Sequence, residues 1–78
     1  MTKRELCEAL SRERFNPACY DLDGGMLSEK YTLANEGNVW CVYYSERGLQ
    51  TGKRTFATES DACEYFLSEL RNDPTTKA

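Results

Sequence analysis

The stretch Asn38 to Gly48, N-V-W-C-V-Y-Y-S-E-R-G, decides how this chain folds. Its centre, Val39 to Tyr44, is an unbroken run of apolar and aromatic residues of the types that favour a pleated sheet. Gly37 and Gly48 bound the run, as expected at the two ends of a strand. We therefore predict that this stretch is the central strand of a small antiparallel sheet.

Turn signals separate the central strand from a neighbour on each side. Residues 35–38, Asn-Glu-Gly-Asn, predict a reverse turn after a strand over residues 29–34. Residues 46–48, Glu-Arg-Gly, predict a second turn, after which a further strand runs to about Phe56. Gly52 interrupts that last strand or marks a bulge in it, and the neighbouring Lys and Arg are typical of an edge protected by charge.

A helix is predicted at each end of the chain. Residues 2–5 have the form of a capping box, and the helix that they open should end near Arg14 because Pro17 disfavours helical geometry before it. Residues 58–61 begin the second helix with the same pattern, and it should end near Asn72. Its apolar stripe consists of Ala62, Cys63, Phe66, Leu67 and Leu70.

The segment between the first helix and the sheet predicts a short strand over residues 18–22 and a turn at residues 23–25, Asp-Gly-Gly. Residues 26–28 stay unassigned. We therefore predict an α+β fold, a small antiparallel three- to four-stranded meander with an N-terminal and a C-terminal helix packed on one face. We expect one domain over residues 1–74 and a disordered tail over residues 75–78.

Composition restricts the classes of function. The net charge of −3 and the pI near 4.9 argue against a nucleic-acid partner, which would require a basic surface. The sequence has no signal-peptide pattern and no apolar run near the ~20 residues of a membrane helix, which predicts a cytoplasmic protein without a membrane partner. The spacing of the four cysteines and the absence of histidine argue against disulfides and a zinc site, and favour free buried thiols.

Catalysis has little support in the sequence. A serine or cysteine nucleophile would lack the histidine that usually serves as its base. No glycine-rich phosphate loop is present, and the carboxylates show no spacing that selects an acid/base pair. We therefore expect a protein that is not an enzyme, with no catalytic residues, no cofactor and no metal.

The central strand is apolar on both faces, and two helices on one side of the sheet would cover only one face. Val39, Cys41 and Tyr43 point one way, and Trp40, Val42 and Tyr44 point the other way. Three alternatives account for the face that the helices leave open. Loops of the chain such as residues 26–28 cover it, a second copy binds through Trp40, Val42 and Tyr44, or another partner binds there. A stacking surface for single-stranded nucleic acid, built from Trp40, Tyr43 and Tyr44, is a further alternative that the acidic balance disfavours.

The second helix has a strongly acidic outer face. Between Glu59 and Asp73 the sequence holds five carboxylates and one cation, Arg71. Asp61, Glu64 and Ser68 lie opposite the apolar stripe, with Tyr65 and Glu69 on the flank. This face is either a solvated helix surface or a docking face for a basic protein.

Two strings carry a family resemblance. They are W-C-V-Y-Y-S-E-R-G at residues 40–48 and F-A-T-E-S-D-A-C-E-Y-F-L at residues 56–67, supported upstream by residues 14–17 and 20–25. They resemble small bacterial immunity proteins that are encoded beside polymorphic toxins and neutralise the toxin's C-terminal domain. The opening of the chain is similar to immunity proteins of the Maf system, whose toxin domains include EndoU-type RNA-cleaving nucleases.

The resemblance implies a non-enzymatic toxin inhibitor that acts in bacterial competition through a protein–protein interaction. Its partner would be a cognate toxin domain, such as a basic nuclease. The residues expected to face the toxin lie first on the second helix and then at the hairpin tip: Asp61, Glu64, Tyr65, Ser68, Glu46 and Arg47. The alternative is a homodimeric scaffold or regulatory module.

Overall fold

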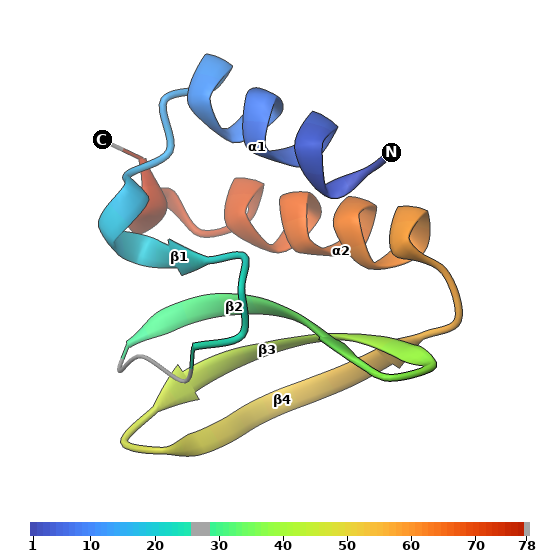
Figure 1. Ribbon diagram of the computed structural model, residues 1–78. Helices are drawn as coiled ribbons and strands as arrows, with labels where there is room; N and C mark the ends of the chain where they lie inside the picture. The colour runs from blue at the N-terminus through green and yellow to red at the C-terminus, as the bar shows by residue number, and fades with distance from the viewer. Residues whose placement is uncertain (26–28, 78) are drawn as a thin grey trace.

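The computed structural model describes residues 1–25 and 29–77 and has an α+β fold with one helix near each end of the chain (Figure 1). Its helices and strands are α1 (Lys3–Arg12), β1 (Tyr20–Asp21), β2 (Lys30–Glu36), β3 (Val39–Glu46), β4 (Leu49–Phe56) and α2 (Glu59–Arg71). Short 3-10 helices, η1 (Pro17–Cys19) and η2 (Pro74–Thr76), follow the two α-helices. The predicted class and the two terminal helices are confirmed.

Strands β2, β3 and β4 form the predicted antiparallel meander, in which β3 pairs with a neighbour on both edges. The turn between β3 and β4 consists of Arg47 and Gly48, and both have positive φ angles, 51° and 81°. Two such residues form the hairpin turn whose twist matches that of the flanking strands. The pairing of β3 with β4 shifts register between Val42 and Tyr44, so Gly52 lies at a bulge, as one of the two sequence readings expected.

The first strand differs from the prediction, because β1 runs parallel to β2 and the sheet is therefore mixed. The turn at residues 23–25 exists, and the Asp21 carboxylate accepts hydrogen bonds from the backbone N–H groups of Asp23 and Gly25 at 2.9 and 2.7 Å. It does not close a hairpin, because Gly24 passes against Ala34 of β2. A Cβ atom on Gly24 would lie 2.9 Å from Ala34 Cβ. The described residues after β1, up to residue 25, therefore approach β2 at Ala34. The unassigned residues 26–28 lie outside the described residues.

Both helices lie on the same side of the sheet, as predicted, but in successive layers (Figure 1). Helix α2 contacts the three long strands, and α1 packs mainly against α2. The helices run in the same direction. Lys3 N donates to the Glu59 carboxylate at one end, and Arg71 Nε donates to the Glu13 carboxylate at the other, each at 2.9 Å.

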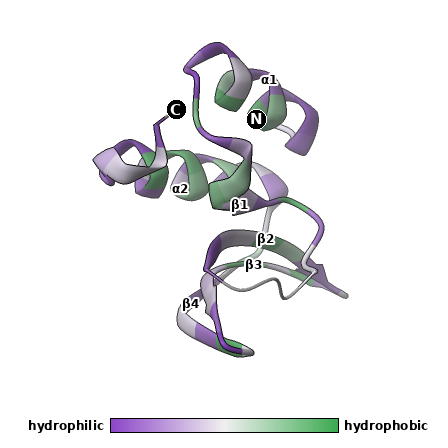
Figure 2. Ribbon diagram, turned by 90° about the vertical axis from the view of Figure 1, so that its left-hand side faces the viewer, coloured by the Kyte–Doolittle hydropathy of each residue, from purple (hydrophilic) through white to green (hydrophobic). Residues whose placement is uncertain are grey.

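The main core lies between α1, α2 and the upper face of the sheet, where the apolar segments of both helices turn inward (Figure 2). Its buried members are Leu6, Ala9, Leu10, Phe15, Leu33, Val42, Ala62, Cys63, Phe66, Leu67 and Leu70. The predicted apolar stripe of the second helix is thus entirely buried. A smaller buried cluster of Ala34, Cys41 and Tyr43 lies on the opposite face of the sheet.

The helix starts agree with the sequence prediction. In the capping box of α1, Thr2 Oγ1 accepts a hydrogen bond from Glu5 N–H at 3.2 Å, and Thr2 N–H donates to Glu5 Oε1 at 2.8 Å. Thr58 caps α2, which ends before Asn72 as expected. Helix α1 ends two residues earlier than predicted, because Arg14 adopts a left-handed conformation with φ 61°.

The cysteines are free, as predicted, but only two of them are buried. Cys41 and Cys63 lie in the interior, where burial raises the pKa of the Cys63 thiol to about 11 and keeps it protonated at neutral pH. Cys7 is exposed and Cys19 is half-buried, against the prediction of buried thiols. The helical period explains Cys7, because Leu6 and Leu10 occupy the inward positions of α1.

Residues 75–77 pack against the rest of the chain, although the sequence predicted a disordered tail over residues 75–78. Thr76 is 2% exposed, and its hydroxyl donates to the Leu70 carbonyl oxygen at 2.8 Å. Asn16 N–H donates to the Thr76 carbonyl oxygen at 2.7 Å, and Phe15 forms a β-bridge with Lys77. The contacts of Asn16 and Phe15 join segments about sixty residues apart, so no local sequence pattern predicts them.

Candidate partner-binding surface

The outer face of α2 is exposed in the positions that the sequence predicts. Asp61, Glu64 and Ser68 face solvent, and Tyr65 and Glu69 are half-buried at the flank. The ion pairs among the described residues join Lys3 to Asp23, Lys53 to Glu36 and Arg71 to Glu13, so none of them neutralises this face. Ser60 links it to a cation, because its hydroxyl contacts both the Met1 ammonium group at 2.8 Å and the Glu64 carboxylate at 3.0 Å.

The second predicted partner site, Glu46 and Arg47, is also exposed, at the turn between β3 and β4. That turn lies at one end of the sheet, and the first turn of α2 lies at the other end (Figure 1). Strand β4 spans the distance between them. The structure therefore does not bring Glu46 and Arg47 next to Asp61, and the two predicted sites are separate.

The proposed dimer face of Trp40, Val42 and Tyr44 lies on the helix side of the sheet. Val42 is 2% exposed in the main core, Trp40 packs against that core, and Tyr44 contacts Tyr31. Val42 and Trp40 therefore belong to the core, and Tyr44 packs on Tyr31, so the three residues form no continuous open apolar face.

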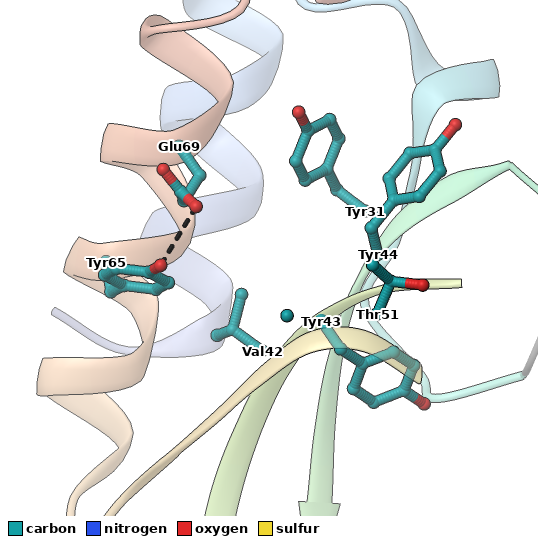
Figure 3. A pocket seen from close by; sticks show the side chains of 8 residues that line it. Tyr31, Val42, Tyr43, Tyr44, Thr51, Tyr65 and Glu69 are labelled. Carbon is teal, nitrogen blue, oxygen red and sulfur yellow. Dashed lines mark hydrogen bonds between the residues drawn. The ribbon is translucent and has the colours of Figure 1, made fainter. Parts of the chain in front are cut away.

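The proposed stacking surface of Trp40, Tyr43 and Tyr44 is divided between the two faces of the sheet. The Tyr43 ring points away from α2 (Figure 3) and is 3% exposed. The side chain of Lys53 also crosses this far face, where it reaches Glu36 at 2.9 Å. Gly24 lies against Ala34 there, so segments of the chain itself cover part of this face.

A cleft that the sequence reading did not identify lies between α2 and strands β3 and β4 (Figure 3). Its volume is about 240 Å³. It is lined by Tyr31, Val42, Tyr43, Tyr44, Thr51, Gly52, Tyr65 and Glu69. A smaller hollow of about 60 Å³ shares Tyr31 and Tyr44 with it and also touches Glu29 and Asp73.

The hairpin register builds the aromatic wall of the cleft. Tyr31 and Tyr44 are paired across β2 and β3, with ring centroids 5.1 Å apart and ring planes at 73°. Such edge-to-face packing is favourable for aromatic rings. On the β4 side the wall is low, because Gly52 has no side chain and sits at the bulge with φ 65°.

Helix α2 supplies the opposite wall. Tyr65 Oη donates a hydrogen bond to Glu69 at 2.9 Å (Figure 3), and the Tyr65 ring packs on Phe56 at 5.3 Å between centroids. The Arg54 guanidinium lies 5.7 Å from the centroid of the Tyr65 ring. Burial, followed by the hydrogen bond to Glu69, raises the pKa of Tyr65.

Tyr31 connects the cleft to the end of α2, because its hydroxyl donates to the Asp73 carboxylate at 2.8 Å. Burial and this hydrogen bond raise the pKa of Tyr31 to about 12. Hydrogen bonds from Thr75 and from Tyr31 lower the pKa of Asp73. At neutral pH the phenols are therefore protonated donors and Asp73 is ionised, which gives this edge of the cleft a negative charge.

Two sequence signals indicate the residue pairs that form the two walls of the cleft. Counting outward from the two-residue turn at Gly37 pairs Tyr31 with Tyr44, and the spacing of Tyr65 and Glu69 places them one turn apart on a helix. What the sequence does not give is the position of α2 above β3, which brings the two pairs together.

Comparison with models of protein families, with curated proteins and with solved structures found no match to this chain. Within residues 1–25 and 29–77, no helix has both the length and the apolar character that a membrane span requires.

Proposed function

We propose that this chain is an immunity protein that binds a cognate toxin C-terminal domain and neutralises it. The observation that carries the proposal is the outer face of α2, where Asp61 and Glu64 are exposed and form no ion pair among the described residues. The resemblance of residues 40–48 and 56–67 to immunity proteins supports the same function.

The mechanism requires binding and no chemistry by this chain. A nuclease that acts on RNA needs a basic cleft for its phosphate-rich substrate, and an EndoU-type toxin domain is of this kind. An acidic surface is steered toward such a cleft by its electric field and competes there with the substrate. The inhibitor then acts in the cytoplasm of the cell that makes it, without a cofactor.

A second candidate function is a homodimeric scaffold or regulatory module, and one observation favours it. Among the described strands, β4 lies at one edge of the sheet, and its residues from Leu49 to Thr55 are all exposed. Leu49 is 67% exposed. An unpaired edge of this length can add a strand from a second copy. Sedimentation of the isolated chain tests this candidate, because a monomer at every concentration would reject it.

Co-purification tests the proposed function. The chain is expressed together with the toxin C-terminal domain encoded immediately upstream, with a tag on the toxin only. We expect an equimolar complex on size exclusion and loss of the toxin's activity. Absence of a complex, or a complex that leaves the toxin fully active, would contradict the proposal. The chain expressed alone serves as the mass standard.

A further inference from the structure

The cleft between α2 and the sheet brings aromatic faces, an apolar contact and carboxylate groups into one small space. Tyr31, Tyr44 and Tyr65 supply the aromatic rings, Val42 supplies the apolar contact and Glu69 supplies a carboxylate (Figure 3). Its volume of about 240 Å³ is below the range of roughly 300 to 1,000 Å³ that is usual for small-molecule sites. The cleft therefore suits one long side chain of a partner better than a cofactor.

The charge at the cleft comes mainly from carboxylates. Glu69 lines the cleft, Glu29 and Asp73 line the adjoining hollow, and the Arg54 guanidinium lies 5.7 Å from the centroid of the Tyr65 ring. Among the described residues, no lysine or arginine lines either space. A phosphate or carboxylate ligand would be repelled here, and a cation would be attracted.

The two hydroxyl groups leave the carboxylates able to accept further hydrogen bonds. Tyr65 Oη donates one hydrogen bond to Glu69, and Tyr31 Oη donates one to Asp73. An ionised carboxylate offers about four acceptor positions. Glu69 therefore retains free positions beside the aromatic rings, held in a fixed orientation by the Tyr65 hydroxyl.

We propose that this cleft receives an arginine side chain from a basic protein partner. The aliphatic part of the arginine would lie against Val42 and Tyr44, and the guanidinium would stack on a tyrosine ring and donate to Glu69. Arginine fits better than lysine, because its planar guanidinium both stacks on aromatic faces and forms forked hydrogen bonds with a carboxylate. The same kind of contact occurs within the chain, where the Arg54 guanidinium lies 5.7 Å from the centroid of the Tyr65 ring.

This inference rests on the proposed function for its choice of a protein partner. Tyr65 and Glu69 belong to α2, the helix whose outer face is proposed to meet the toxin domain. A partner docked along α2 could therefore insert an arginine into the cleft at the edge of the same interface, where it would anchor the complex.

The test uses the intact chain and needs no toxin. N-acetyl-arginine methylamide is titrated into the labelled protein and followed by NMR, and the citrulline analogue, which has nearly the same shape and no charge, is titrated in parallel. We expect saturable shifts, with a dissociation constant in the millimolar range, at Tyr31, Tyr44, Tyr65 and Glu69. We expect no saturable shift with the citrulline probe. Equal responses to both probes, or no saturable response to arginine, would overturn the inference.

A matched pair of variants separates the cleft from the general acidity of the chain. Glu69→Gln removes the charge but keeps an oxygen that accepts from Tyr65, and it should weaken binding of the arginine probe roughly three- to ten-fold. Glu8→Gln makes the same change at an exposed residue of α1, outside the cleft and the outer face of α2, and should leave binding unchanged. Equal weakening by both variants would overturn the inference. Arginine binding without a toxin complex would contradict the proposed function alone, and a toxin complex without arginine binding would contradict the cleft alone.

Discussion

Tyr31 is the residue that connects the sheet, the cleft and the end of α2. Its ring packs edge-to-face on Tyr44, and its hydroxyl donates to Asp73 at 2.8 Å. The folded chain holds the phenolic proton more tightly than the unfolded chain, since the pKa of Tyr31 is raised from 10.0 to about 12. The stability that this contributes is complete below pH 10 and is lost as the pH rises toward about 12.

The variant Tyr31→Phe should therefore be less stable than the wild type at pH 8, by about 1 kcal/mol for the lost hydrogen bond. The difference should shrink as the pH rises from 10 toward about 12, because only the wild type loses the contribution of Tyr31. Urea unfolding at a series of pH values measures both proteins under the same conditions. A difference that stays constant across this pH window would contradict the role given to Tyr31.

At the scale of the elements, two glycines share a left-handed backbone conformation but differ in their surroundings. Gly24 has φ 66° and lies against Ala34 of β2, whereas Gly52 has φ 65° and open space around it. Gly52→Ala should cost about 1 kcal/mol of stability for backbone strain alone. Gly24→Ala should cost measurably more, because its new methyl group would also lie 2.9 Å from Ala34 Cβ.

Thermal or urea unfolding of the two variants provides the measurement, with Gly52→Ala as the control for the strain. The double variant Gly24→Ala with Ala34→Gly should recover part of the additional loss, because it removes the crowded methyl group. Equal losses for the two single variants would show that the segment after β1 does not pack on β2 as described.

The elements governed by local signals could be predicted from the sequence. The apolar run of β3, the two hairpin turns, both helix caps and the buried stripe of α2 each appear in a short stretch of chain. The parallel direction of β1 could not be predicted, because it depends on the contact of Gly24 with Ala34, and a two-residue strand carries almost no pattern of its own. The ordered end at Thr76 depends equally on a distant partner, Asn16.

For the candidate surface too, some features could be predicted from the sequence and others depend on the tertiary structure. The exposed positions of α2 follow from the helical period, so Asp61, Glu64 and Ser68 were placed correctly on the outer face. The orientation of Trp40, Val42 and Tyr44 depends on which face of β3 receives α2, and alternation alone does not decide this. The cleft requires both the strand register and the position of α2, and only the tertiary structure supplies the second.

At the scale of the whole molecule, the charges are distributed unevenly. Lys3, Lys53 and Arg71 are held in ion pairs with acidic partners, whereas Asp61 and Glu64 on α2 have no such partner among the described residues. The outer face of α2 therefore presents carboxylates without an ion-pair partner, next to a cleft with acidic edges. A basic partner would meet this side first, because long-range attraction orients the encounter.

A positive charge placed on that face tests directly whether the partner binds there. Ser68→Lys changes an exposed residue of α2, and Ser11→Lys makes the identical change at an exposed residue of α1. Both proteins should fold as the wild type does, because no side-chain hydrogen bond of either serine is present among the described residues. Calorimetric titration with the toxin domain should show about ten-fold weaker binding for Ser68→Lys and wild-type binding for Ser11→Lys. Wild-type affinity in Ser68→Lys, or equal weakening in both variants, would contradict the claim that the partner binds the outer face of α2.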